Sequence, residues 1–283
     1  MRSRLLSPVR AQLIARVVLW SMMALAITIL ALVLWFVLRR GLAHIDWEFL
    51  STAPTDSGRS GGIFPIVIGT LEVTLLGVAV AAPLGVGTAV YLAEYTKEGR
   101  LTRAIRFGSE CLAGVPSIII GLFGFVLFVT TLGLGWSILS GALTLALMTL
   151  PLVIRTSEEA LKAVPAAYRE VSLSLGASKW QTILAVVLPA ALPGIFTGLI
   201  LSLGRAVGET AALIFTAGSS LPHHVPRSLL DGTRTLSIHF YQLAREGISA
   251  DHAYATAAVL VLTITFINLG SSFAMHRFMR RYA

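Results

Sequence analysis

The sequence contains few charged residues and a single cysteine, and both shortages limit what the protein can be. Only 13% of its 283 residues are charged, whereas 55% are hydrophobic. Soluble domains carry roughly 25% charged residues, so this chain has too few charges to cover a soluble surface. The lone cysteine, Cys111, excludes an intrachain disulfide framework and a two-cysteine metal site. The composition therefore predicts an integral membrane protein with several spans.

The sequence also lacks the common signatures of nucleotide-binding and hydrolytic enzymes. It has no Gly-x-x-x-x-Gly-Lys-Ser/Thr loop, no nucleophile elbow and no metalloprotease helix. Four of the six histidines fall between residues 216 and 252, but their spacing is not typical of a zinc site. We expect a protein that is not an enzyme, holds no metal and binds no cofactor, so that any ATP is used by another subunit.

Six apolar stretches are long enough to cross a bilayer, which takes about 20 helical residues. The first resembles a signal peptide, but it is longer than a signal core and is followed by Arg39 and Arg40 instead of a cleavage site. It is interpreted as a retained anchor. The sequence predicts an all-α polytopic membrane protein with six transmembrane helices, placed near 17–38, 63–95, 109–131, 137–154, 183–215 and 253–275.

Lysine and arginine are distributed unequally over the segments between these spans. Fifteen of the 22 lie in the segments 1–16, 96–108, 155–182 and 276–283. Six lie in the opposite segments, 39–62, 132–136 and 216–252, which have nearly the same total length. Cytoplasmic segments of membrane proteins are enriched in these residues, which explains the net charge of +8 better than nucleic-acid binding does. Both termini are therefore predicted to be cytoplasmic.

Several spans contain residues that can bend a helix. The stretches 63–95 and 183–215 are too long for one straight crossing, and the second contains Pro189 and Pro193. Such prolines are either tolerated kinks or bends around a transport pathway. Gly114 and Pro116 in the third span allow the same two interpretations, close helix packing or a bend near the pathway.

The stretch 183–215 carries two charged residues, Arg205 and Glu209, inside an apolar span. A charge at the membrane centre costs about 2.5–3.5 kcal/mol on insertion scales, so its presence favours a functional role. On one helix the two side chains would share a face. They form either a structural ion pair or an anion site, in which Arg205 attracts an oxyanion, Glu209 orients Arg205 and Thr210 adds a hydroxyl donor. Glu72 is a secondary candidate, expected at the outer boundary of the second span.

The cytoplasmic segment 155–182 contains signals for two short helices. Thr156 and Glu159 have the spacing of a capping box, which predicts that a helix begins there. Pro165 and Gly176 mark the start and end of a second helix. Its apolar face carries Tyr168, Val171 and Leu175. This amphipathic helix either lies on lipid headgroups or docks into a cytoplasmic partner.

The spacing of Glu170-Val-Ser, Gly176 and Val186-Val-Leu188-Pro189 resembles the EAA loop of ABC importer permeases. The family usually has alanines where this chain has Val171 and Ser172. The resemblance implies that the loop 156–189 is the coupling loop, and that Glu170, Gly176, Tyr168, Val171 and Leu175 contact the ATPase subunit.

Other segments are similar to phosphate permeases of the PstA/PstC type. They are Gly114-Val-Pro-Ser117, Gly204-Arg-Ala-Val-Gly-Glu-Thr210 and Tyr91-Leu-Ala-Glu-Tyr95. The segment Ala211–Gly218 favours the A-type. The resemblance implies a bacterial inner membrane protein with an N-terminal part (1–61) and a type-1 permease domain (62–283), in which five helices form the core.

By the same resemblance, the partners are a C-type permease, a homodimeric cytoplasmic ATPase and an extracytoplasmic phosphate-binding protein. The chain would form half of an inorganic phosphate pathway that works by alternating access. Three alternatives stay open: an ABC permease for phosphonate, sulfate or molybdate, a stand-alone ion-coupled transporter, and a regulatory or scaffold membrane protein.

Overall fold

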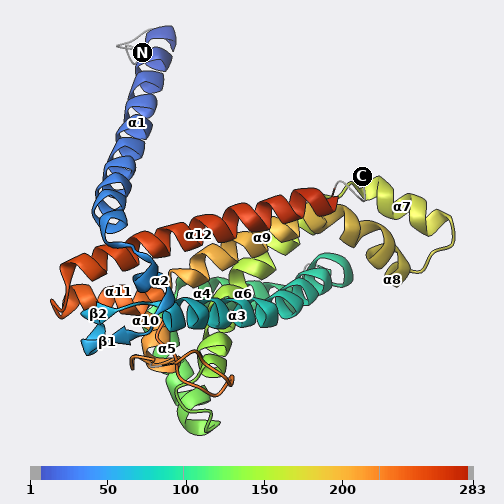
Figure 1. Cartoon of the computed structure of the whole chain (residues 1–283). Helices are drawn as coiled ribbons and strands as arrows, with labels where there is room; N and C mark the ends of the chain where they lie inside the picture. The colour runs from blue at the N-terminus through green and yellow to red at the C-terminus, as the bar shows by residue number, and fades with distance from the viewer. Residues whose placement is uncertain (1–7, 98, 223, 280–283) are drawn as a thin grey trace.

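The computed structural model describes residues 8–279 except 98 and 223, and it is almost entirely helical (Figure 1). Two short strands, β1 (Pro54–Thr55) and β2 (Ser60–Gly61), pair antiparallel. The α-helices are α1 (Pro8–Gly41), α2 (Trp47–Ser51), α3 (Phe64–Val90), α4 (Arg100–Gly114), α5 (Ser117–Gly124), α6 (Ile138–Ala163), α7 (Ala166–Ser174), α8 (Lys179–Thr182), α9 (Leu188–Val207), α10 (Ala211–Thr216), α11 (Leu236–Arg245) and α12 (Ala250–Met279). Short 3₁₀ segments are η1 (Leu42–His44) and η2 (Asp56–Gly58), and π-helical segments are η3 (Tyr91–Tyr95), η4 (Phe125–Thr131) and η5 (Ile183–Val187).

Five helical stretches of the described chain are long and apolar enough to cross a membrane. They are Gln12–His44, Phe64–Tyr95, Ile138–Ala163, Lys179–Val207 and Ala250–Arg277. A sixth candidate is the pair Arg100–Gly114 and Ser117–Thr131, whose two helices meet at a bend of 102°. The fold is therefore that of an all-α, multi-pass membrane protein, with six spans if the bent pair counts as one.

The helices α3 and α6 pack closely and form the centre of the molecule. Small residues allow this approach: a side chain added at Gly77 would lie 3.0 Å from the carbonyl oxygen of Ala142, and one at Gly85 would lie 2.6 Å from Val153. The helix α6 is the most buried of the spans, because 67% of its most apolar segment lies inside the molecule. The third helix of the core, α9, packs against both.

The first helix, α1, projects away from the other helices (Figure 1). Its most apolar segment is 0% buried within this chain. Contact with α12 is confined to the C-terminal end of α1, where the rings of Phe36 and Tyr254 meet edge to face at 5.8 Å. Gly41 lies against Tyr254 and Ala258 of α12, so closely that no larger side chain fits. The helix is thus fixed at one end only.

Three predicted elements differ in detail from the structure. The expected span 109–131 is two helices, because Pro116 disfavours helical backbone at Val115 and ends α4. The expected stretch 183–215 is not one continuous helix. Helix α9 ends at Val207, and a separate helix, α10, begins at Ala211. No separate helix begins at Thr156, since its hydroxyl donates to the Leu152 carbonyl within the continuous helix α6.

Candidate functional site

Arg205 lies in the last turn of α9 and lines a cavity of about 130 Å³. The cavity is enclosed by the end of α4, the start of α5 and the middle of α6. A second arginine, Arg155 of α6, lines the same cavity. The sequence does not distinguish Arg155 as a site residue, because it directly follows an apolar run and falls in a segment predicted to be cytoplasmic. Arg155 and Arg205 are the two charged residues that line this cavity, and the other lining residues are apolar. A guanidinium group is a planar fork of hydrogen-bond donors.

A second cavity of about 270 Å³ adjoins the first. Both are lined by Ala113, Pro151 and Arg155, and the second also reaches Arg106 and Lys162. The basic side chains in this region have carboxylate partners: Arg155 contacts Glu159 at 3.1 Å, Arg106 contacts Glu158 at 2.6 Å, and Lys162 contacts Glu158 at 2.7 Å. Arg205 differs from them, because no ion pair or hydrogen bond within the described residues occupies its guanidinium.

Arg205, Glu209 and Thr210 are not brought together as the sequence suggested. Because α9 ends at Val207, Glu209 lies beyond the helix, and its carboxylate accepts a hydrogen bond from the amide of Ala212 at 3.3 Å. The shared helix face and the predicted contact between Arg205 and Glu209 are therefore absent in the described chain. Thr210 lines a different cavity, of about 490 Å³, between α10, α11 and α5.

The remaining pathway candidates lie in different surroundings. Gly114 and Pro116 flank the 102° bend between α4 and α5, whose residue Val115 lines the cavity of Arg205. Pro189 and Pro193 are exposed on the uninterrupted span Lys179–Val207. Glu72 lies in α3, and its Oε2 atom is buried without a hydrogen-bond partner.

The predicted amphipathic helix between Pro165 and Gly176 is confirmed as α7. It lies with α8 at the end of the molecule that also holds the C-terminal end of α12, opposite β1, β2 and α11 (Figure 1). Its side chains Tyr168, Val171 and Leu175 are 52%, 60% and 83% exposed, and Glu170 is exposed as well. An uncovered apolar face on a short polar-flanked helix is the pattern expected of a docking element.

Gly176 ends α7 in the left-handed region, with a φ of +85°. Its amide donates to the Leu173 carbonyl at 3.0 Å, and the next amide, of Ala177, donates to Ser172 at 3.2 Å. This pair of bonds closes the helix, and glycine adopts the required conformation without strain. The left-handed backbone at the end of α7 therefore explains why glycine occupies position 176.

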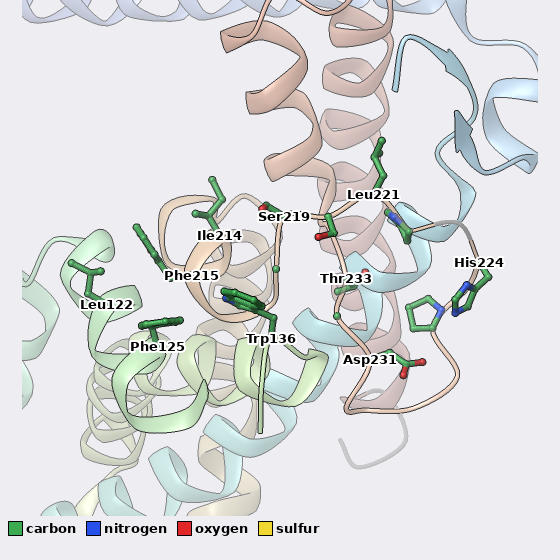
Figure 2. A pocket seen from close by; sticks show the side chains of 15 residues that line it. Leu122, Phe125, Trp136, Ile214, Phe215, Ser219, Leu221, His224, Asp231 and Thr233 are labelled. Carbon is green, nitrogen blue, oxygen red and sulfur yellow. The ribbon is translucent and has the colours of Figure 1, made fainter. Parts of the chain in front are cut away.

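A further cavity, of about 770 Å³, lies at a different place and is mostly apolar (Figure 2). Phe125, Trp136 and Phe215 form one side of it, and Asp231 lies in the opposite loop. Backbone amides of Arg227 and Ser228 donate to the Asp231 carboxylate and lower its pKa, so this group is negatively charged at neutral pH. An anion is not favoured there, in contrast to the cavity of Arg205.

No group of three or more His, Cys, Asp or Glu side chains that could hold a metal ion occurs among the described residues. Of the four histidines between 216 and 252, His223 lies outside the described residues. His239 is buried, with 1% of its surface exposed, and accepts a hydrogen bond from Arg234. Its ring is therefore engaged in packing.

Comparison with known proteins shows the family of the chain. The family model of the binding-protein-dependent transport system inner membrane component matches residues 81–283. Probable ABC transporter permease protein YqgI of Bacillus subtilis (strain 168) is 34% identical over 250 residues, 83% of this chain and 85% of the relative. Phosphate transport system permease protein PstA 1 of Mycobacterium tuberculosis (strain CDC 1551 / Oshkosh) is 36% identical over 275 residues, 94% of this chain and 88% of the relative.

Solved structures with the same fold are those of ABC transporters. A chain of the bacterial alginate ABC transporter, in complex with a periplasmic protein, matches with a TM-score of 0.66 at 16% identity, covering 95% of this chain and 96% of that one. A chain of the MetNI methionine ABC transporter, in an inward-facing conformation, matches with a TM-score of 0.61 at 21% identity, covering 74% and 92%. The predicted permease fold is thereby confirmed, and the chain belongs to the family of inner membrane components of binding-protein-dependent transport systems.

Proposed function

We propose that this multi-pass inner membrane protein forms half of the pathway of an ATP-driven importer of inorganic phosphate. The observation that carries the proposal is the cavity in which Arg205, without an ion-pair partner among the described residues, lies with Arg155. Arginine suits a tetrahedral oxyanion, because its guanidinium group presents several donors in a fixed plane. The PstA relative, 36% identical over 94% of the chain, supports phosphate as the anion.

The arrangement of charges also fits release of the anion. Arg155 is already paired with Glu159, so a bound phosphate competes with a neighbouring carboxylate instead of being held by a fully free cation. The adjoining cavity continues to Arg106 and Lys162, whose shared partner is Glu158. A carrier needs such balanced binding, because an anion that is held too tightly is not released.

Other subunits of the proposed complex would supply the second half of the pathway, the ATPase and the substrate-binding protein. A second permease of the C-type would complete the pathway, and a homodimeric cytoplasmic ATPase would bind and hydrolyse ATP. An extracytoplasmic phosphate-binding protein would deliver the substrate. This chain would bind no cofactor and catalyse no reaction, and its exposed helix α7 would dock into the ATPase. ATP-driven movements would then open the Arg205 cavity to one side of the membrane and afterwards to the other. Both termini would be cytoplasmic.

The test is ATP-dependent phosphate uptake by the reconstituted complex with Arg205→Gln. A hydrogen bond to a charged group contributes about 1.5–3 kcal/mol, so uptake should fall at least about tenfold while the amount of assembled complex is unchanged. Arg103→Gln is the matched control, since this exposed arginine of α4 lines neither cavity and should leave uptake normal.

Different outcomes separate the alternatives. Near-normal uptake by Arg205→Gln would refute the pathway role, and uptake without any ATPase would favour an ion-coupled transporter. If the complex transports phosphonate, sulfate or molybdate in place of phosphate, the class holds but the anion is wrong.

A further inference from the structure

One side chain of α7, that of Arg169, contacts the ends of two membrane helices. Its guanidinium donates to the carboxylate of Glu94, from Nε to Oε1 at 3.0 Å and from Nη2 to Oε1 at 2.6 Å. The same group donates to the carbonyl oxygens of Leu161 and Val164, both at 2.8 Å. Arg169 thus ties α7 to two other elements at once, namely the end of α3 and the end of α6.

The partner, Glu94, occupies a special place in its helix. It lies in η3, a π-helical turn that continues α3 at its C-terminal end. Its side chain is only 8% exposed, and that of Arg169 is 24% exposed. π-Helical turns are uncommon and occur frequently at functional sites. A charge-assisted pair in such a sheltered place is both stronger and more directional than an exposed ion pair.

Two further contacts join the same elements to α8, which leads into α9. The hydroxyl groups of Ser172 and Thr182 lie 2.9 Å apart, and the ammonium group of Lys179 lies 5.1 Å from the ring centre of Tyr95. The inner side of α7 is therefore bound to α3, α6 and α8 by polar contacts. Its outer side, with Tyr168, Val171 and Leu175, is uncovered.

We propose that the ion pair between Arg169 and Glu94 transmits movement of α7 to the membrane helices. The proposal rests on the proposed docking of α7 to an ATPase. Arg169 is a positioning residue, because it contacts neither the anion cavity nor the exposed face of α7. Apolar contacts alone would allow α7 to slide over the ends of α3 and α6. The guanidinium fixes their relative position, because it bonds one carboxylate and two backbone carbonyls in one plane.

The experiment measures phosphate uptake and ATP hydrolysis by the complete complex in proteoliposomes, and compares their ratio among variants. Glu94→Gln and Arg169→Gln should each lower the phosphate taken up per ATP hydrolysed at least about threefold, while the ATPase still co-purifies. The double variant should be no worse than Arg169→Gln alone, because that substitution already removes the interaction with Glu94. Arg169→Lys should give an intermediate ratio, since lysine keeps the positive charge but lacks the planar set of donors of a guanidinium group. Arg103→Gln, which removes an exposed arginine from α4, should keep the normal ratio.

An unchanged ratio in both single variants would overturn the proposal. So would loss of the assembled complex in both, since the pair would then serve only to hold the fold. If only Arg169→Gln fails to assemble, the ratio measured for Glu94→Gln tests the proposal, because this variant keeps both hydrogen bonds from Arg169 to the backbone carbonyls. A wild-type complex without ATP-dependent phosphate uptake would refute the proposed function, whereas an active wild type with normal variants refutes this inference alone.

Discussion

At the scale of single residues, the segment between α10 and α11 contains a buried arginine that the sequence did not reveal. Arg234 is 8% exposed, and its Nε and Nη2 atoms donate to the carbonyl oxygen of Ser219. Its Nη1 atom lies 3.3 Å from Nδ1 of His239. Because arginine only donates, this ring nitrogen must accept, and His239 is therefore neutral with its proton on Nε2. Burial lowers the pKa of Arg234 to about 10, which leaves it charged at neutral pH.

The buried histidine predicts a pH dependence of stability. Burial, together with the positive charges of Arg234 and His252, lowers the pKa of His239 to about 3. An unfolded histidine has a pKa of about 6.5, so below that pH the unfolded chain binds more protons and the folded state loses stability. The loss from this group is at most about 1.4 kcal/mol per pH unit between roughly pH 6.5 and pH 3.

His239→Asn removes this titration while keeping an acceptor for Arg234. The drop in melting temperature between about pH 7.5 and pH 5, measured on purified protein in detergent, should therefore be smaller than in the wild type. His224→Asn, at an exposed histidine of the same region, should keep the wild-type drop. Equal drops in all three proteins would mean that His239 does not control acid stability.

At the scale of elements, apolar runs and punctuating residues predicted most of the helices but not the breaks between them. Pro165 and Gly176 predicted the two ends of α7, because proline is tolerated where a helix begins and glycine adopts the left-handed backbone that ends one. The break after Val207 depends on Glu209, whose carboxylate accepts from the amide of Ala212 and so stabilises a new helix start. In the sequence the same carboxylate looked like a partner of Arg205, four residues away. The spacing along the sequence cannot distinguish a carboxylate that pairs with an arginine on the same helix from one that accepts a backbone amide at the start of the next helix.

The end of α7 provides a prediction about coupling. Gly176 has a φ of +85°, and an added Cβ would meet no atom within 4 Å, so a substitution acts through backbone strain alone. Left-handed backbone costs a non-glycine residue roughly 1–2 kcal/mol, and asparagine tolerates it best. Gly176→Val should therefore reduce co-purification with the ATPase and ATP-dependent uptake several-fold, whereas Gly176→Asn should stay close to the wild type.

Gly247 is a matched control for this experiment. It follows α11, has a φ of +63° and is equally open around an added Cβ. Gly247→Val should thus strain the chain in the same way without changing contact with the ATPase. If Asn and Val at position 176 are equally harmful, the space around Gly176 in the assembled complex matters more than its backbone conformation.

At the scale of the whole molecule, the candidate site could be predicted only in part. Arg205 was recognisable because a charge in an apolar span is costly. Its cavity was not, since that space depends on the 102° bend after α4 and on the packing of α6 beside α9. Arg155 became a candidate only when tertiary structure placed it in the same cavity. The distribution of lysine and arginine, by contrast, yields a prediction about the whole chain without any tertiary detail.

That prediction concerns the orientation of the chain in the membrane. With Cys111 changed to serine, single cysteines are introduced at two exposed charged positions, Arg100 at the start of α4 and Glu246 after α11. If both termini are cytoplasmic, Glu246→Cys should react with a membrane-impermeant maleimide in intact spheroplasts. Arg100→Cys should react at least about tenfold less until the cells are lysed. The cysteine-free protein gives the background. The opposite pattern would reverse the topology and would place α7 on the wrong side for an ATPase, so one labelling experiment also bears on the proposed docking.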